Sequence, residues 1–101
     1  MKKLLVWIAA VMMAGGWEVT VDPHPLNTGV IMATACGAGY DYYAFNRRDL
    51  EAGETKVWFP RPTGMPEEKA CWSDFYVTRR LADDSDNPAD EAQVHIAHVI
   101  Y

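Results

Sequence analysis

The chain of 101 residues is poor in basic residues, with nine lysines and arginines against 14 aspartates and glutamates and a formal net charge of −5. Apart from Lys2-Lys3, its only adjacent basic pairs are Arg47-Arg48 and Arg79-Arg80, so no basic stripe runs along the chain. Nucleic-acid binding draws much of its affinity from basic side chains that neutralise phosphates. The sequence therefore argues against a nucleic-acid partner.

The chain also lacks an apolar run long enough to cross a membrane. Its longest run, Leu4 to Ala14, has eleven residues and as a helix would span about 16 Å, roughly half of a hydrocarbon core. Lys2 and Lys3 precede this run and small residues follow it, which is the order of a secretory signal. We predict a signal segment over residues 1–16 and a mature start between Gly15 and Trp17. A retained N-terminal strand or helix is the alternative.

Cysteine is scarce, with Cys36 and Cys71 lying 35 positions apart. That spacing excludes the short paired spacing of zinc sites and of redox C-x-x-C motifs. In an oxidising compartment a bond between them would stabilise the fold by roughly 4 kcal/mol in the chain-entropy model. We predict a structural disulfide. Two free buried thiols are the alternative, and no pattern pairs either cysteine with a base for nucleophilic chemistry.

Catalytic and metal-binding patterns are absent as well. No Ser/His/Asp arrangement or paired carboxylates indicate a hydrolase, although triads assemble from distant residues. On a strand, His95 and His98 would point to opposite faces because their separation is odd, so we expect no metal site from this pair or from His24. The acidic run from Asp83 to Glu91 has proline and alanine where a calcium loop needs a ligand and glycine. We predict a protein without cofactor, metal or enzymatic activity.

What the sequence does contain is a series of short β patterns separated by turn residues. The turn and loop regions are Asp22 to Pro25, Asn27-Thr28-Gly29, Gly37 to Gly39, Arg61 to Lys69 and the acidic loop from Asp83 to Glu91. The apolar, β-branched run Val30 to Cys36 predicts a central strand with both faces covered. The predicted strands are Trp17–Val21, Val30–Cys36, Tyr40–Phe45, Thr55–Phe59, Cys71–Leu81 and Gln93–Tyr101.

The last of these segments has two interpretations. As a strand, it would place Val94, Ile96, His98 and Ile100 on one face. A helix competes, because Asn87 is a possible N-cap and Pro88 suits a first turn. The β-branched residues favour the strand, with at most one helical turn before it.

The middle of the chain resembles secreted immunoglobulin-like sandwich domains. The resemblance rests on about ten residues, in which Leu50, a glycine turn at Gly53 and a β-branched strand up to Phe59 follow one another. It implies architecture and no activity. Trp58 and Trp72 are both candidates for the core tryptophan that this family places between paired cysteines. We therefore predict an all-β fold: one small antiparallel immunoglobulin-like β-sandwich domain over residues 17–101 with one disulfide.

The aromatic residues are the best clue to function. Tyr40, Tyr42 and Tyr43 cluster beside Asp41 on a strand whose two faces cannot both be deep core in so small a protein. Tyrosine suits contact surfaces because it combines apolar area with a polar tip. The alternative is that these rings simply fill the core. We predict a binding patch of Tyr40, Tyr42, Tyr43, Trp58 and Phe59.

The acidic residues Asp83, Asp84 and Asp86 would then steer a basic partner by long-range attraction. The function predicted from the sequence is a secreted or periplasmic binding or inhibitory module, whose partner is a protein or an envelope component. The alternative is a structural subunit of a fibre, pilus or coat, joined to its neighbours through strand edges.

Overall fold

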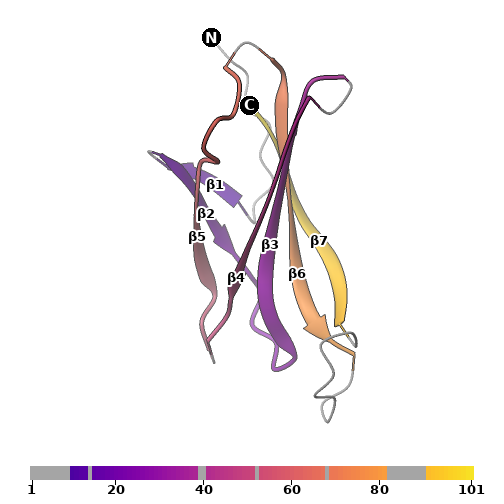
Figure 1. The fold of residues 1–101 in the computed structure, drawn as a ribbon. Coiled ribbons are helices and arrows are strands. Elements are labelled where there is room, and N and C mark those ends of the chain that lie inside the picture. The colour runs from indigo at the N-terminus through magenta and orange to yellow at the C-terminus, as the bar shows by residue number, and fades with distance from the viewer. Residues whose placement is uncertain (1–9, 14, 39–40, 52, 68, 82–90) are drawn as a thin grey trace.

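The computed structural model describes residues 10–13, 15–38, 41–51, 53–67, 69–81 and 91–101. The predicted antiparallel all-β architecture is confirmed, because these residues form two antiparallel sheets (Figure 1). This part of the chain contains no helix long and apolar enough to cross a membrane. The strands are β1 (Ala10–Met13), β2 (Gly16–Thr20), β3 (Asn27–Cys36), β4 (Tyr42–Asp49), β5 (Lys56–Pro60), β6 (Cys71–Arg80) and β7 (Glu91–Ile100).

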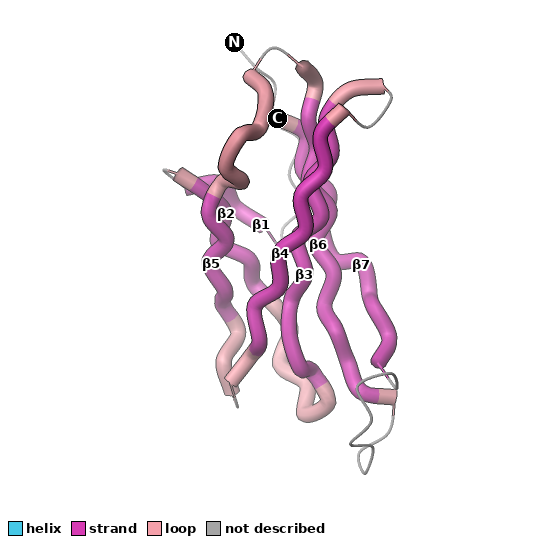
Figure 2. Tube along the Cα trace, viewed as in Figure 1, coloured by secondary structure: helices cyan, strands magenta, loops and turns pink. Residues whose placement is uncertain are grey.

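The sheets form two layers that face each other (Figure 2). The smaller has the strand order β1-β2-β5 and the larger the order β4-β3-β6-β7. The chain crosses between the sheets after β2, after β4 and after β5. Consequently β1 and β5 are the edges of the smaller sheet, and β4 and β7 are the edges of the larger one.

The core lies between the layers because side chains alternate along each strand, so that every second one points inward. Trp17 and Phe59 from the smaller sheet pack on Phe75 from the larger, with ring centroids 6.5 and 5.8 Å away. Tilted and edge-on arrangements of this kind add to the free energy of burial. The remaining core residues are mostly valines, which suit a pleated surface: Ala10, Val19, Val21, Val30, Met32, Val57, Val77, Ala97 and Val99.

The predicted disulfide is confirmed. Cys36 ends β3 and Cys71 begins β6, and the two face each other directly in the register with their Cα atoms 4.1 Å apart. Both side chains are buried. Backbone hydrogen bonds from Gly37 N–H to the Ala70 carbonyl (3.0 Å) and from Tyr101 N–H to the Cys71 carbonyl (3.0 Å) close the same end of the sheet. The bond thus joins neighbouring strands of one sheet.

A chain of hydrogen bonds connects the two sheets inside the core. The Trp17 indole N–H donates to the Tyr101 hydroxyl at 3.0 Å, and that hydroxyl lies 2.7 Å from the Ser73 hydroxyl. Ser73 in turn lies 2.7 Å from the buried hydroxyl of Thr34. Each polar group in this series of hydrogen bonds therefore has a partner, which offsets the cost of burying the group.

Replacing Tyr101 by phenylalanine should lower the free energy of unfolding by about 1–3 kcal/mol, because the Trp17 N–H would lose its acceptor inside the core. The matched control is Tyr42→Phe, which removes an exposed bond from the Tyr42 hydroxyl to the Thr63 carbonyl. Urea unfolding of both variants measures the difference. An equal loss of unfolding free energy in the two variants would mean that the buried hydrogen bonds of Tyr101 stabilise the fold no more than the exposed bond of Tyr42.

The N-terminal strand overlaps the predicted signal segment. Residues Ala10–Met13 form β1, with Ala10 opposite Val19 and fully buried in the core. For these four residues the structure corresponds to the retained strand that we kept as the alternative. Removal of residues 1–15 would take β1 away and leave one edge of β2 unpaired. Residues 1–9 and 14 lie outside the described residues, so cleavage remains a prediction.

Some strand boundaries differ from the prediction. The turn predicted at Asn27-Thr28-Gly29 is wrong, since these residues belong to β3 and the turn precedes them. Thr28 contributes there as a strand residue, because its hydroxyl lies 2.8 Å from that of Thr78. β4 continues beyond Phe45 to Asp49, because β3 begins early enough to supply partners as far as Gly29. The predicted glycine turn is present, with Gly53 at φ +80°.

The C-terminal segment is a strand, but the prediction of which of its side chains share one face is wrong. Tyr76 pairs with His95 whereas Phe75 pairs with Ala97, so Ile96 is an extra residue that forms a β-bulge. The bulge ends the simple alternation, and Val94, Ile96, His98 and Ile100 do not share one face. Asn87 and Pro88, which supported the helical alternative, lie outside the described residues.

Candidate functional site

The outer face of the four-stranded sheet carries a group of exposed and half-buried apolar side chains. The register sets β4 and β6 on either side of β3, and the residues opposite each other point to the same face. Tyr43 and Phe45 are 61% and 57% exposed, and it is their grouping with other apolar side chains on one face that is informative. We call the following residues the outer aromatic face: Tyr43 and Phe45 on β4, Trp72 and Tyr76 on β6, and Ile100 on β7.

Small residues of β3 form the floor between these side chains. Ala35 lies between Tyr43 and Trp72, and Ala33 lies between Phe45 and Asp74. Ala35 is only 5% exposed although it points away from the core, because the larger neighbouring side chains shield it. The central strand is thus covered on both faces, as the apolar run Val30 to Cys36 predicts.

A carboxylate with two histidines lies beside the aromatic rings. One Asp74 oxygen is 2.9 Å from Nε2 of His95 and 2.6 Å from Nδ1 of His98. The prediction that these histidines point to opposite faces is wrong, because the bulge at Ile96 restores them to the same face. The ring of His95 also packs on Tyr76, with centroids 5.1 Å apart.

The environment of Tyr76 keeps its phenol protonated. Burial raises the pKa of Tyr76, and the charge of Asp74 raises it further. A phenol with a raised pKa remains a hydrogen-bond donor throughout the physiological range. The face therefore combines apolar rings with polar groups held in fixed positions.

Arg47, which forms ion pairs with two carboxylates, bounds this face near the C-terminal end of β4. Arg47 Nε donates to Asp49 at 2.9 Å, and an Nη atom lies 3.4 Å from Glu91 on β7. The hydrogen bond to Asp49 raises the pKa of Arg47, and Glu91 adds to the rise. Gly29 leaves room for the Arg47 side chain to cross β3, because a Cβ at Gly29 would lie 3.1 Å from the guanidinium and 2.9 Å from the Arg48 carbonyl. The positive charge of Arg47 is therefore balanced locally by Asp49 and Glu91.

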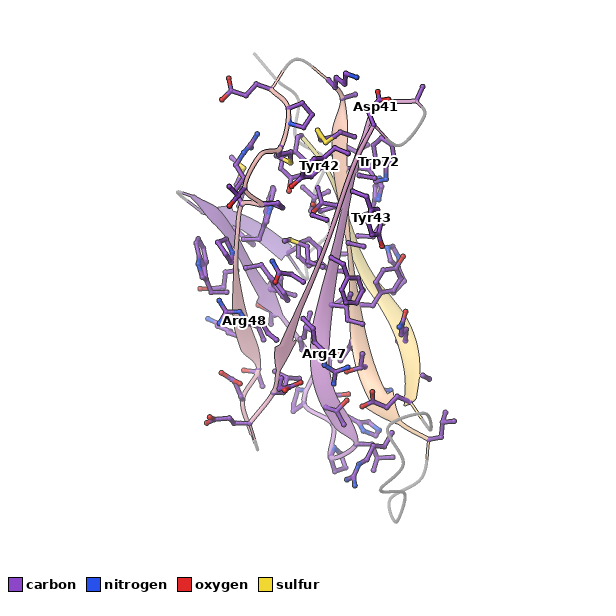
Figure 3. The ribbon with its side chains drawn as sticks, viewed as in Figure 1. Asp41, Tyr42, Tyr43, Arg47, Arg48 and Trp72 are labelled. Atoms are coloured by element: carbon purple, nitrogen blue, oxygen red, sulfur yellow. A yellow bond between two sulfur atoms is a disulfide. The ribbon has the colours of Figure 1, made fainter. Side chains whose placement is uncertain are left out.

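The structure separates the aromatic residues that the sequence grouped together. Tyr43 is on the outer aromatic face, whereas Tyr42 points to the other side of β4, as Figure 3 shows, and packs on the disulfide cluster. Trp58 is 39% exposed on the smaller sheet, and Phe59 is fully buried in the core. Tyr40, Asp83, Asp84 and Asp86 lie outside the described residues.

Neither of the two tryptophans predicted as core candidates, Trp58 and Trp72, lies in the core. Trp17 on β2 is buried, while Trp58 and Trp72 both point away from the core. Phe45, Trp72, Tyr76 and Ile100 join the face although the sequence did not assign them to a site. The alternation within Cys71 to Leu81 was the available signal, since Trp72, Asp74 and Tyr76 are two residues apart.

A separate hollow of about 620 Å³ lies where the β2–β3 loop meets the β4–β5 turn, and it is lined by His24, Leu50, Glu51 and Glu54 among others. His24 is engaged in its own loop, since its Nδ1 accepts the Leu26 N–H at 3.1 Å. Within the described ranges, no group of three or more His, Cys, Asp or Glu side chains could hold a metal ion. The outer aromatic face therefore remains the candidate site. No protein-family model matches the chain, and neither a curated protein nor a solved structure matches it.

Proposed function

We propose that the chain is a secreted or periplasmic, non-enzymatic binding module that contacts its partner through the outer aromatic face. One observation supports this above all others: four aromatic side chains and Ile100 lie on one side of a single sheet, outside the core. Exposed apolar clusters on soluble proteins commonly mark interaction sites, and tyrosine and tryptophan are enriched there.

We further propose that the fold is an immunoglobulin-like sandwich. The described part of the chain supports this assignment with seven strands in two antiparallel sheets and crossings after β2, β4 and β5. The disulfide within one sheet and the core tryptophan on β2 depart from the antibody pattern, in which the bond joins two sheets. Related sandwiches share the architecture without sharing these details.

Two features support export from the cytoplasm. The disulfide requires an oxidising compartment in most organisms, and Lys2-Lys3 with the apolar run after them suits a secretory signal. Removal of those two lysines would change the formal charge from −5 to −7, that is −5 minus 2. A protein or envelope component with basic groups would therefore be attracted, and a cationic secreted enzyme would fit an inhibitory role.

Substitutions on the outer aromatic face, compared with a control substitution on the smaller sheet, test the proposed contact surface. Tyr76→Ser combined with Ile100→Ser should abolish capture of a partner from envelope extract by the immobilised protein. Trp58→Ser is the matched control, because Trp58 and Ile100 are each 39% exposed but lie on different sheets. Circular dichroism establishes that the variants remain folded. Equal capture by the double variant and the parent would overturn the assignment of this face.

A second function, that of a subunit joined to neighbours through strand edges, is favoured by the open edge of β4. Among the described residues, the eight of this strand pair with β3 alone. An exposed edge of this length is a template for pairing with another chain.

A further inference from the structure

The edge strands differ in how they are protected against pairing with another chain. β1 has only four residues, β5 contains Lys56 and ends at Pro60, and β7 is interrupted by the bulge at Ile96. Short length, charged side chains (lysine above all), proline and bulges are the usual protective features of edge strands. β4 pairs with β3 over eight residues without a register shift and contains neither proline nor lysine, and its charged residues Arg47, Arg48 and Asp49 all lie at its C-terminal end. From Tyr42 to Asn46, β4 therefore has none of these protective features.

The backbone of β4 is oriented for such pairing. The Leu50 N–H donates to the Thr28 carbonyl at 2.9 Å, which fixes the residues that bond to β3. Bonding direction alternates along an antiparallel strand, so Asn46 and Arg48 also direct their backbone groups toward β3. Tyr43, Phe45 and Arg47 consequently direct their N–H and C=O groups toward the open edge.

Side chains on both faces of this strand are exposed. Tyr43, Phe45 and Arg47 are exposed on the outer face, and Asn46 and Arg48 are exposed on the inner one. Arg47 and Arg48 point to opposite sides of the strand (Figure 3). The smaller sheet therefore does not bury the inner side of β4 at these positions.

The sequence of β4 is complementary to itself when two copies run antiparallel. Its first half is aromatic, with Tyr42, Tyr43 and Phe45, and its second half contains Arg47 and Arg48. Pairing around Phe45 sets Tyr43 opposite Arg47 and Tyr42 opposite Arg48, twice each. Arginine next to an aromatic ring is favourable, whereas an axis at Arg47 would oppose two like charges.

We propose that two copies of this chain form a homodimer through antiparallel pairing of their β4 strands about a two-fold axis at Phe45. The two four-stranded sheets become one continuous sheet, with both outer aromatic faces on the same side. Because each copy uses the same edge, the interface closes on itself and yields a dimer rather than a fibre. This inference does not depend on the partner proposed for the outer aromatic face. It excludes fibre assembly through β4, because the dimer occupies that edge in both copies.

Sedimentation velocity over a range of concentrations tests the dimer on the full chain. The parent should sediment as a concentration-dependent dimer. Phe45→Lys should raise the dissociation constant at least about tenfold, because two lysines would lie opposite each other at the axis. Val94→Lys is the control, since Val94 is also exposed but lies on the edge strand β7. A parent that remains monomeric, or a dimer that Phe45→Lys leaves intact, would overturn the proposal.

Single cysteines test the register, with Cys36 and Cys71 already bonded to each other. Phe45→Cys should give a disulfide-linked dimer on mild oxidation, since directly opposed, hydrogen-bonded residues have Cα atoms about 5.5 Å apart, within the disulfide range. Tyr43→Cys should not, because the two copies of residue 43 would lie about 14 Å apart along the strands. Equal cross-linking from both positions, or cross-linking from residue 43 alone, would overturn the register.

Discussion

Replacing Cys71 by serine should lower the free energy of unfolding by about 2–5 kcal/mol. The bond closes a loop of 35 positions, for which the chain-entropy model gives roughly 4 kcal/mol. Small domains have a total stability of only about 5–15 kcal/mol, so the variant should be unfolded in part at elevated temperature. Urea unfolding monitored by circular dichroism measures the loss.

The reduced parent protein is the control for this substitution. Its stability should fall to about that of Cys71→Ser, because both proteins lack the same cross-link. If the parent in strong reductant retained its full stability, the bond would contribute little to the fold. The disulfide would then give weaker support to the proposed oxidising compartment.

Replacing Phe75 by alanine should cost about 3–5 kcal/mol of unfolding free energy, the range for large aromatic side chains in a core. Phe75 is fully buried and packs on both Trp17 and Phe59, so its removal leaves a cavity between the sheets. Phe45→Ala is the matched control, because that ring is 57% exposed. Chemical denaturation at a concentration where the chain is monomeric compares the two. Equal losses would mean that the core is not centred on Phe75.

Much of the core could be predicted from the sequence because it depends on local alternation of apolar and polar residues. The pattern from Trp17 to Val21 identified β2 and its buried side, and Val30 to Cys36 identified the central strand. The cysteine pairing followed from having only two candidates. The faces of the β7 side chains were not predicted, because they depend on the one-residue register shift at Ile96. No glycine or proline marks this bulge in the sequence.

The candidate site depended on which strands become neighbours, and this is a tertiary property. Adjacent tyrosines at positions 42 and 43 looked like one patch, but adjacent strand residues point to opposite faces. Trp72 and Tyr76 join Tyr43 only because β3 lies between β4 and β6. Trp58 was grouped with them by composition, although β5 belongs to the other sheet.

Site-specific photo-cross-linking tests the central claim, that the outer aromatic face contacts a partner. A photoreactive residue, p-benzoylphenylalanine, replaces Trp72 in one protein and Trp58 in another, so that the same change is made on the outer surface of each sheet. Irradiation of cells that export the chain should give an adduct with another protein or envelope component from position 72 and none from position 58. An adduct from position 58 alone, or no adduct from position 72, would contradict the claim.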